Sequence, residues 1–237
     1  MLYYTIKFAL KRMLKDYTNI ILLVIVPLGI ITIIALAFAE DKAVIDASAA
    51  GMTIAFQIFG GFYTLEFLKA DLFTTKKWKI YALPCSIPMY AYGILIASTI
   101  FNGFQGLTIV LVTKLFFGVE WVSIWGVALS LLILSLFSQL VFLNILLSVK
   151  NEKYADRFGE VFAWGSVILS NYFFRMPDNV FFNTVSKYTP IKLTEDAIAS
   201  IRYQSGLMNI INPLAILLVA SVVLTILSYL LGRRKLV

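Results

Sequence analysis

Residues 17–39 read YTNIILLVIVPLGIITIIALAFA, and no charged residue stands between Asp16 and Glu40. A helix rises 1.5 Å per residue, so about 20 apolar residues cross the roughly 30 Å of bilayer hydrocarbon. This stretch is therefore long enough to cross a membrane once. Five further uncharged runs follow, framed by Asp46 and Glu66, Lys79 and Lys114, Glu120 and Lys150, Glu160 and Arg175, and Arg202 and Arg233.

The composition agrees with a membrane protein. The 237 residues are 60% hydrophobic and 14% charged, which leaves too little polar surface for a soluble fold. We predict one all-α, polytopic membrane domain over residues 1–237, with six crossings. The expected segments are an interfacial helix at 1–17, membrane helices at 18–39, 47–68, 88–113, 122–148, 157–174 and 208–231, a loop at 69–87 and a polar segment at 175–205.

The fifth run differs from the others because it supplies only fourteen uncharged residues between Glu160 and Arg175. That is short for a crossing. It either recruits Phe158 and Gly159, with charged residues at the membrane boundary, or enters the membrane without fully crossing it.

The basic residues predict the orientation of the chain. The N-terminal segment, alternate joints between runs and the tail carry fourteen Lys and Arg residues, against six at the other joints. By the positive-inside rule both termini are cytoplasmic. The net charge of +7 is then a topology signal, and because no recognisable nucleic-acid motif accompanies it we expect no nucleic-acid partner. A secretory signal peptide is excluded because its apolar core would have roughly 7 to 15 residues, so we expect a retained first crossing.

The segment before the first crossing is amphipathic. Lys7, Lys11, Arg12 and Lys15 occupy one side of a helical wheel. This predicts a helix in the inner membrane interface with its basic face toward anionic lipid headgroups. A simple positive flank with no further role is the alternative. The opposite arc contains Leu2, Ile6, Ala9, Leu10, Met13 and Tyr17.

The joint between the second and third runs combines polar, basic and aromatic residues and then reaches a proline. A short amphipathic helix at the cytoplasmic surface is expected there. Its apolar residues, Trp78, Tyr81 and Leu83 among them, would fill a groove of a partner, and its lysines would meet an acidic rim. The alternative is a solvated loop whose aromatic rings rest among the headgroups.

Two groups of residues resemble a known family in their order. The first is Glu66, Asp71, Thr74-Thr75, Leu83-Pro84, Ser86 and Gly93, and the second is Met176-Pro177, Phe181, Phe182, Tyr188-Thr189-Pro190, Glu195-Asp196-Ala197 and Arg202-Tyr203. Together with six runs and an N-terminal interfacial helix, this order resembles the ABC-2 type transporter permeases over nearly the whole chain. The resemblance implies two short extracellular helices before the last crossing.

The resemblance also implies a function. ABC-2 permeases of this kind are half-transporters of bacterial plasma membranes that export antibiotics, peptides, drugs or lipid-like molecules. They pair with a second permease, identical or related, and with two copies of a cytoplasmic ATPase, which bind ATP and Mg²⁺. On this basis the ATPase-coupling residues are Glu66, Asp71, Lys76, Lys77, Trp78, Tyr81, Leu83 and Pro84. No G-x-x-x-x-G-K-[ST] phosphate loop is present, so this chain would bind no cofactor itself.

Polar residues inside the apolar runs lie at helical spacing. Ser98, Asn102 and Gln105 fall at i, i+4 and i+7, which places them on one helix face. Hydrogen bonds between helices are the commoner reason for such a face, and a translocation path is the alternative. Gly60-Gly61 permits either close packing or a bend. The path candidates are Gln57, Ser98, Asn102, Gln105, Ser135 and Gln139.

Enzymatic functions are disfavoured. The chain has no histidine and a single cysteine, Cys85, so we expect no catalytic residues, no metal site and no intrachain disulfide. Besides an exporter permease, two hypotheses remain: a secondary transporter or channel, and a membrane scaffold that transports nothing. A proton or ion relay would place ionisable residues in mid-membrane, and the runs contain none.

Overall fold

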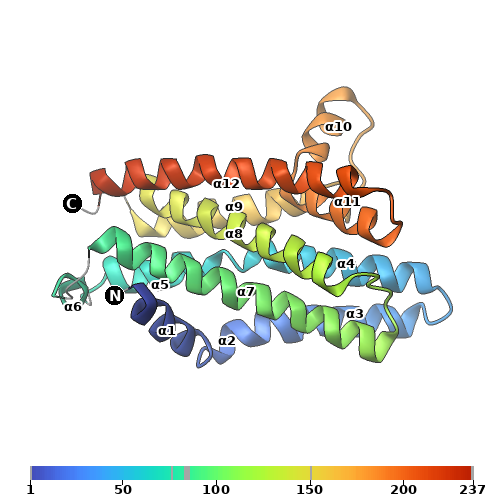
Figure 1. The fold of residues 1–237 in the computed structure, drawn as a ribbon, viewed down its shortest axis with the longest axis horizontal. Helices are drawn as coiled ribbons and strands as arrows, with labels where there is room; N and C mark the ends of the chain where they lie inside the picture. Colours follow the sequence, from blue (N-terminus) through green and yellow to red (C-terminus); the bar gives the residue numbers. More distant parts are fainter. Residues whose placement is uncertain (1, 76, 83–85, 150, 236–237) are drawn as a thin grey trace.

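The computed structural model describes residues 2–75, 77–82, 86–149 and 151–235 (Figure 1). Within these ranges the chain forms helices and connecting loops and no β-strand. The helices are α1 (Leu2–Met13), α2 (Tyr17–Ile20), the π-helical segment η1 (Ile21–Ile25), α3 (Val26–Ala37), α4 (Lys42–Phe59), α5 (Phe62–Leu72), α6 (Lys77–Tyr81), α7 (Ile87–Phe117), α8 (Ile124–Ser148), α9 (Glu152–Leu169), α10 (Val180–Lys187), α11 (Pro190–Arg202) and α12 (Leu207–Lys235).

Five helical stretches of the described chain are long and apolar enough to cross a membrane. They are Tyr17–Ala37, Lys42–Leu72, Ile87–Phe117, Ile124–Ser148 and Leu207–Gly232. The prediction of an all-helical, polytopic membrane protein is confirmed at this level. The first of these stretches joins α2, η1 and α3, and the second joins α4 and α5.

The fifth predicted membrane helix has different bounds from those expected. It was placed at 157–174, whereas α9 spans Glu152–Leu169. The helix begins early because the side chain of Asn151 accepts the backbone N–H of Lys153. It ends early because Asn171 adopts a positive φ of 57°. Its first half therefore carries several charged residues, and α9 is not among the five stretches.

The second membrane helix is longer than predicted at both ends. The expected range was 47–68, whereas the helical stretch begins at Lys42 and ends at Leu72. The Asp41 side chain caps its start by accepting the backbone N–H of Val44. Lys42 and Asp46, which the charge pattern placed outside the helix, are each paired with a residue of another segment.

The long helices run side by side along one direction (Figure 1). The start of α1, the end of α12 and helix α6 lie at one end, which we call the terminal end. The loops at 38–41, 118–123 and 203–206 lie at the other, which we call the distal end. Because α8 ends at the terminal end and α12 begins at the distal end, α9 and the loop after it carry the chain back along the bundle.

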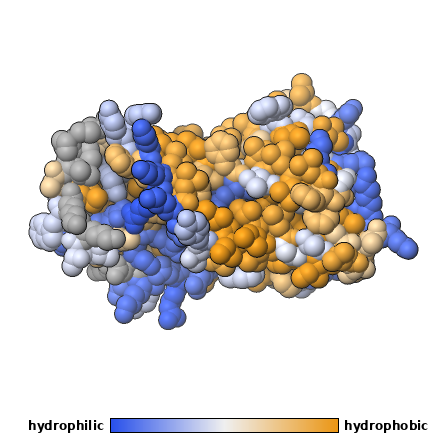
Figure 2. Space-filling model, turned by 90° about the horizontal axis from the view of Figure 1, so that it is seen from below, coloured by the Kyte–Doolittle hydropathy of each residue, from blue (hydrophilic) through white to orange (hydrophobic). Residues whose placement is uncertain are grey.

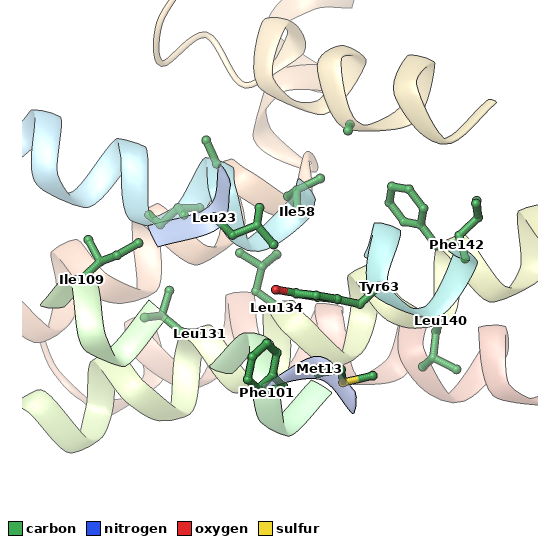
Figure 3. Close-up of a cluster of buried hydrophobic side chains, with 14 of the residues drawn as sticks. Met13, Leu23, Ile58, Tyr63, Phe101, Ile109, Leu131, Leu134, Leu140 and Phe142 are labelled. Atoms are coloured by element: carbon green, nitrogen blue, oxygen red, sulfur yellow. The ribbon is translucent and has the colours of Figure 1, made fainter. Parts of the chain in front are cut away.

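The centre of the bundle is formed by side chains from almost every long helix. Met13, Ile58, Tyr63, Phe101 and Leu134 contribute to it, and Figure 3 shows Tyr63 lying among Leu134, Phe101 and Ile58. In a water-soluble protein, burying these side chains would stabilise the fold by about 25 cal/mol for each Å² of apolar surface removed from water. In a bilayer the same contacts act mainly through close packing, because lipid tails are as apolar as the side chains.

The outer surface of the bundle is apolar as well. Large hydrophobic side chains of α3 and α12 point outward, including Leu36 (77% exposed) and Val219 (64% exposed). The face shown in Figure 2 carries a broad hydrophobic band between hydrophilic surfaces at the two ends. A soluble protein rarely exposes so large an apolar area, whereas hydrocarbon accommodates it. The surface therefore agrees with the five membrane-crossing stretches.

The N-terminal amphipathic helix forms, but it is shorter than the predicted 1–17 and ends at Met13. Its apolar arc packs on α7 of the same chain, and a Cβ atom added at Gly93 would lie 2.6 Å from Thr5 Cγ2. The sequence did not indicate which apolar surface this arc contacts, and in the structure it is α7. Tyr17, placed on the same arc, is instead 73% exposed in α2 because the Asp16 side chain starts a new helix there.

The polar segment at 175–205 contains α10 and α11, at the distal end (Figure 1). The predicted Thr189-Pro190 turn lies between them. The Thr189 hydroxyl oxygen accepts the backbone N–H of Lys192, and Pro190 occupies the first helical turn, where its missing N–H costs no hydrogen bond.

Candidate functional site

The membrane stretch formed by α4 and α5 is interrupted at Gly60 and Gly61. In a continuous helix the carbonyl of Gln57 would accept a hydrogen bond from the N–H of Gly61, and the N–H of Thr64 would donate to the carbonyl of Gly60. The N–H of Gly61 instead bonds to a carbonyl three residues back, at 3.1 Å. The break therefore releases one carbonyl and one N–H in the middle of the bundle, where no water replaces the missing partner.

Side chains of α7 and α8 take up both released groups. Asn102 Nδ2 donates to the carbonyl of Gln57 at 2.9 Å. Gln139 Oε1 accepts the N–H of Thr64 at 3.3 Å, while its Nε2 donates to the carbonyl of Gly60 at 2.8 Å. The amide side chains thus replace the helical hydrogen bonds that the break removes.

A second set of bonds ties these amides to one another. Gln57 Nε2 donates to the carbonyl of Asn102 at 2.9 Å, which makes the contact between α4 and α7 reciprocal. Asn102 Nδ2 also donates to Ser135 Oγ at 3.1 Å, and Ser135 donates to the carbonyl of Thr99. We call this set the break network. It comprises Gln57, Gly60, Thr64, Asn102, Ser135 and Gln139.

Five of the six path candidates take part in hydrogen bonds between helices, and all six are buried. Beside the break network, Gln105 Nε2 donates to the hydroxyl of Tyr63 at 2.8 Å. Tyr63 was not singled out in the sequence, because an aromatic residue in an apolar run carries no signal of a polar role. Ser98 is 0% exposed, and its hydroxyl has no hydrogen-bond partner among the described residues. In this conformation these side chains therefore join neighbouring helices, and their role in a translocation path stays a prediction.

The terminal end contains an ion pair that joins α1, α5 and α7. Arg12 Nη1 donates to both carboxylate oxygens of Asp71, at 2.8 and 2.7 Å. Tyr90 donates its hydroxyl to the same carboxylate at 2.7 Å, and the guanidinium lies 4.4 Å from the centre of the Phe67 ring. Asp71 is only 4% exposed. In this conformation the carboxylate of Asp71 is enclosed by α1 and α7 and does not face a partner, whereas the Arg12 side chain is still 41% exposed.

Glu66, the other acidic coupling candidate, lies one helical turn before Lys69. The two are not paired: Lys69 binds Asp156 of α9 at 2.6 Å, and Glu66 accepts the side-chain amide of Asn19 at 3.2 Å. These contacts attach the end of α5 to the start of α9 and to α2. Of the basic residues predicted to face headgroups, Lys7, Lys11 and Lys15 are exposed, in agreement with that role.

Helix α6 lies at the tip of the terminal end (Figure 1). Two of its aromatic side chains point outward, Trp78 at 70% and Tyr81 at 54% exposure. The ammonium group of Lys77 lies 5.1 Å from the Trp78 ring centre. The structure thus places three coupling candidates together on one exposed short helix. Lys76, Leu83 and Pro84 lie outside the described residues.

The distal end is joined by ion pairs that sequence reasoning missed, because each connects segments far apart in the chain. Lys42 pairs with Glu120, and Asp46 pairs with Arg202 at 3.1 Å. Arg202 also donates to the backbone carbonyl of Glu120 at 3.1 Å. The hydrogen bond and the charge of Lys42 lower the pKa of Glu120.

Burial shifts two further groups near this end. Burial raises the pKa of Glu195 even though Lys192 lies 3.1 Å away. Burial also raises the pKa of Tyr172 to about 12, and its hydroxyl donates to the carbonyl of Ala47. Tyr172 therefore stays protonated at neutral pH, and Glu195 lies in contact with Lys192.

Within the described ranges, no group of three or more His, Cys, Asp or Glu side chains is placed to hold a metal ion. In comparisons with known proteins, no family model, no curated protein and no solved structure matches this chain.

Proposed function

We propose that the chain is the transmembrane permease subunit of an ATP-binding cassette exporter of the ABC-2 type. It works with a second permease chain and with two copies of a cytoplasmic ATPase, which bind ATP and Mg²⁺. The substrate is hydrophobic or amphipathic and moves outward across a bacterial plasma membrane. This chain supplies the membrane passage and the coupling surface, while the ATPase supplies the hydrolysis.

The topology proposed with this function has six crossings and a cytoplasmic terminal end. Helix α9 and the loop after it form the sixth crossing: the 18 residues of α9 rise about 27 Å, but only the second half is uncharged, so the loop completes the passage. Its charged first half lies at the inner boundary, where Asp156 pairs with Lys69. The exposed lysines Lys7, Lys11 and Lys15 lie at the terminal end, which supports a cytoplasmic location. The short helices α10 and α11 are then extracellular.

The observation that carries the proposal is the exposed aromatic pair on α6. Trp78 and Tyr81 are large aromatic side chains exposed on α6, which lies at the tip of the terminal end. Tryptophan and tyrosine are the residues most enriched at the centres of protein interfaces, and a lysine beside them suits an acidic rim. A cytoplasmic ATPase with an apolar groove is the partner that this arrangement fits best.

The contacts of α6 offer a route for coupling. Helix α6 packs on α5, and α5 is joined to α4 through the Gly60-Gly61 break. A displacement of α6 by the ATPase would therefore move α5 relative to α4 and strain the break network. The pair Arg12 and Asp71 would move α1 together with α5. A bound nucleotide would then act by favouring one arrangement of the break network over another.

The test is a purification of the tagged chain from its native membranes in mild detergent. We expect a stoichiometric ATPase with a phosphate loop to co-purify, and a second permease sequence if the transporter is a heterodimer. Recovery of the chain alone from several detergents would contradict the proposal.

Replacing Trp78 with alanine should weaken ATPase binding. An exposed aromatic anchor at an interface contributes about 1 to 2 kcal/mol, so the dissociation constant should rise about 5- to 30-fold. Trp125→Ala is the matched control, because Trp125 is 85% exposed at the distal end. The measurement is ATPase binding and substrate-stimulated hydrolysis in proteoliposomes. Equal behaviour of the two variants would remove α6 from the coupling surface.

A second candidate is a secondary transporter, which the discontinuous α4–α5 stretch favours. Broken helices in mid-membrane bind substrates and coupling ions in several such transporters. The discriminating measurement is transport into proteoliposomes that contain the chain alone, driven by a sodium or proton gradient. Gradient-driven transport without an ATPase would establish this candidate and contradict the exporter.

A further inference from the structure

A groove of about 600 Å³ lies at the distal end, between α10, α11 and the first turns of α12. It is separate from the break network and from the coupling helix α6. Its volume falls within the range of about 300 to 1,000 Å³ that is usual for small-molecule sites. The side chains that decide its chemistry are Tyr188, Tyr203, Asn209, Asn212, Ser200 and Ser205.

The lining is mostly neutral and capable of hydrogen bonding. Tyr188 is 56% and Tyr203 is 73% exposed. In the described part of the chain, neither tyrosine hydroxyl nor the amide of Asn212 bonds to another protein group. Each of these groups both donates and accepts, which matches the alternating donors and acceptors of a sugar's hydroxyls. The ammonium group of Lys187 lies 6.0 Å from the centre of the Tyr188 ring, so the more exposed Tyr203 ring is the one suited to stacking on the C–H face of a sugar ring.

The backbone hydrogen bonding of α12 is interrupted beside the groove. Pro213 lies inside this helix and has no N–H, so the carbonyl of Asn209 lacks its usual helical donor. The side-chain amide of Asn209 donates to the carbonyl of Ser205 at 2.6 Å, which holds the asparagine at the groove.

The charges argue against an anionic ligand. One lysine and one aspartate line the groove, Lys187 and Asp196, and Asp196 is also 3.3 Å from Lys192. A phosphate or carboxylate site would gather several cationic donors around one point. The groove has no such cluster, so a neutral polyol is the better match.

The surroundings indicate that the sugar is attached to a lipid. The first turns of α12 also expose Leu207 (75%), Met208 (68%) and Ile211 (52%). The stretch Leu207–Gly232 has 26 residues, about 39 Å of helix, and so exceeds the roughly 30 Å of hydrocarbon. This excess length allows the first turns to lie at headgroup level, with their exposed apolar side chains beside acyl chains. We propose that this groove binds the neutral sugar headgroup of a membrane glycolipid.

The inference does not depend on the proposed function, because binding can be measured without an ATPase. The full chain is purified in a detergent that has no sugar headgroup and mixed with a monoglucosyl diacylglycerol, with phosphatidylglycerol or with free maltose. Native mass spectrometry counts the bound molecules. We expect saturable binding of the glycolipid, at least tenfold tighter than that of either other probe.

The variant pair Tyr203→Ala and Asn212→Ala, combined in one chain, should weaken glycolipid binding at least tenfold. Tyr154→Ala is the control, since Tyr154 is 58% exposed on α9 and lies outside the groove. Tyr203→Phe keeps the ring and should retain most of the binding. Each variant must elute and melt like the parent chain. Preferred binding of phosphatidylglycerol, binding of free maltose equal to that of the lipid, or undiminished binding by the double variant would each overturn the proposal.

Discussion

Replacing Arg12 with alanine is expected to lower the free energy of unfolding by about 3 kcal/mol. The substitution leaves the carboxylate of Asp71, which is 4% exposed, hydrogen-bonded to the Tyr90 hydroxyl but without its cationic partner. Breaking a buried ion pair costs about 3 to 5 kcal/mol because the surviving charge stays desolvated. The lower figure applies because the Arg12 side chain is 41% exposed and water screens part of the pair.

The measurement is reversible unfolding in mixed micelles, with Lys7→Ala as the control. Lys7 is an exposed cation on the same helix and should change stability by less than about 0.5 kcal/mol. Arg12→Lys keeps the charge but not the guanidinium hydrogen bonds to both carboxylate oxygens of Asp71, so an intermediate loss of stability is expected. Equal stability of Arg12→Ala and Lys7→Ala would show that this pair contributes nothing to the fold.

The double variant Arg12→Leu with Asp71→Leu separates charge from packing. Removing both charges also removes the desolvated carboxylate, so the double variant should be more stable than Arg12→Ala. Recovery will be partial, because Tyr90 loses its carboxylate partner. If the double variant is stable but no longer stimulates an ATPase, the pair serves coupling. If it retains stimulation, the pair is structural.

The positions of the membrane helices were largely predictable, because apolar length between charges depends on local sequence alone. The errors arise where a charge is neutralised by a distant partner. Lys42 and Asp46 appeared to exclude a helix, but Glu120 and Arg202 pair with them in three dimensions. No spacing rule in a single sequence reveals such pairs.

The same reason explains the fifth run. Its uncharged stretch was too short to cross a membrane, so the predicted bounds of the helix depended on how many of the charged residues before it could be part of the helix. Asp156 is tolerated within α9 because Lys69 of α5 reaches it at 2.6 Å. The start at Glu152 follows from the Asn151 cap, which is a sequence signal that the charge pattern obscured.

The break network was predictable in part. The spacing of Ser98, Asn102 and Gln105 predicted a polar face, and the glycine pair predicted a bend or close packing. Which backbone groups those side chains bind was not predictable. That depends on the register between α7 and the released carbonyl of Gln57, and register is a property of packed helices.

The amphipathic N-terminal helix shows a related limit. Periodicity identified its apolar arc but could not say which apolar surface receives it. Both lipid and a neighbouring helix satisfy the same pattern. The choice of α7 rests on Gly93, whose missing side chain makes room for Thr5.

Replacing Gly61 with alanine is expected to lower the free energy of unfolding by about 3 kcal/mol, the upper part of the range for overpacked interiors. The new Cβ atom would lie 2.2 Å from Phe142 Cδ2 and 2.5 Å from Ser138 Oγ, too close for either contact. Phe142 is 0% exposed, and its ring packs against Phe62 and Phe162 at centroid distances of 4.6 and 5.9 Å. The ring therefore has little freedom to withdraw. The helix-propensity gain of about 1 kcal/mol for alanine over glycine is too small to offset this clash.

Gly165→Ala is the matched control, since a Cβ atom there meets nothing within 4 Å. Gly165 lies inside α9, so alanine should leave stability unchanged or raise it by up to about 1 kcal/mol. Both variants are compared by unfolding in the same micelles. Equal effects at the two positions would mean that the space around Gly61 is not limiting.

The combination Gly61→Ala with Phe142→Leu tests the cause of the effect. Phe142→Leu alone removes ring contacts and should destabilise the protein, but it also clears the space that the alanine needs. If close contact is the cause, the double variant loses less stability than the two single losses added together, by at least about 0.5 kcal/mol of coupling. Strict additivity would contradict contact with Phe142 as the cause; because Gly61 has a φ of −57°, which alanine adopts without strain, the cost would then lie in the contact with Ser138 Oγ at 2.5 Å.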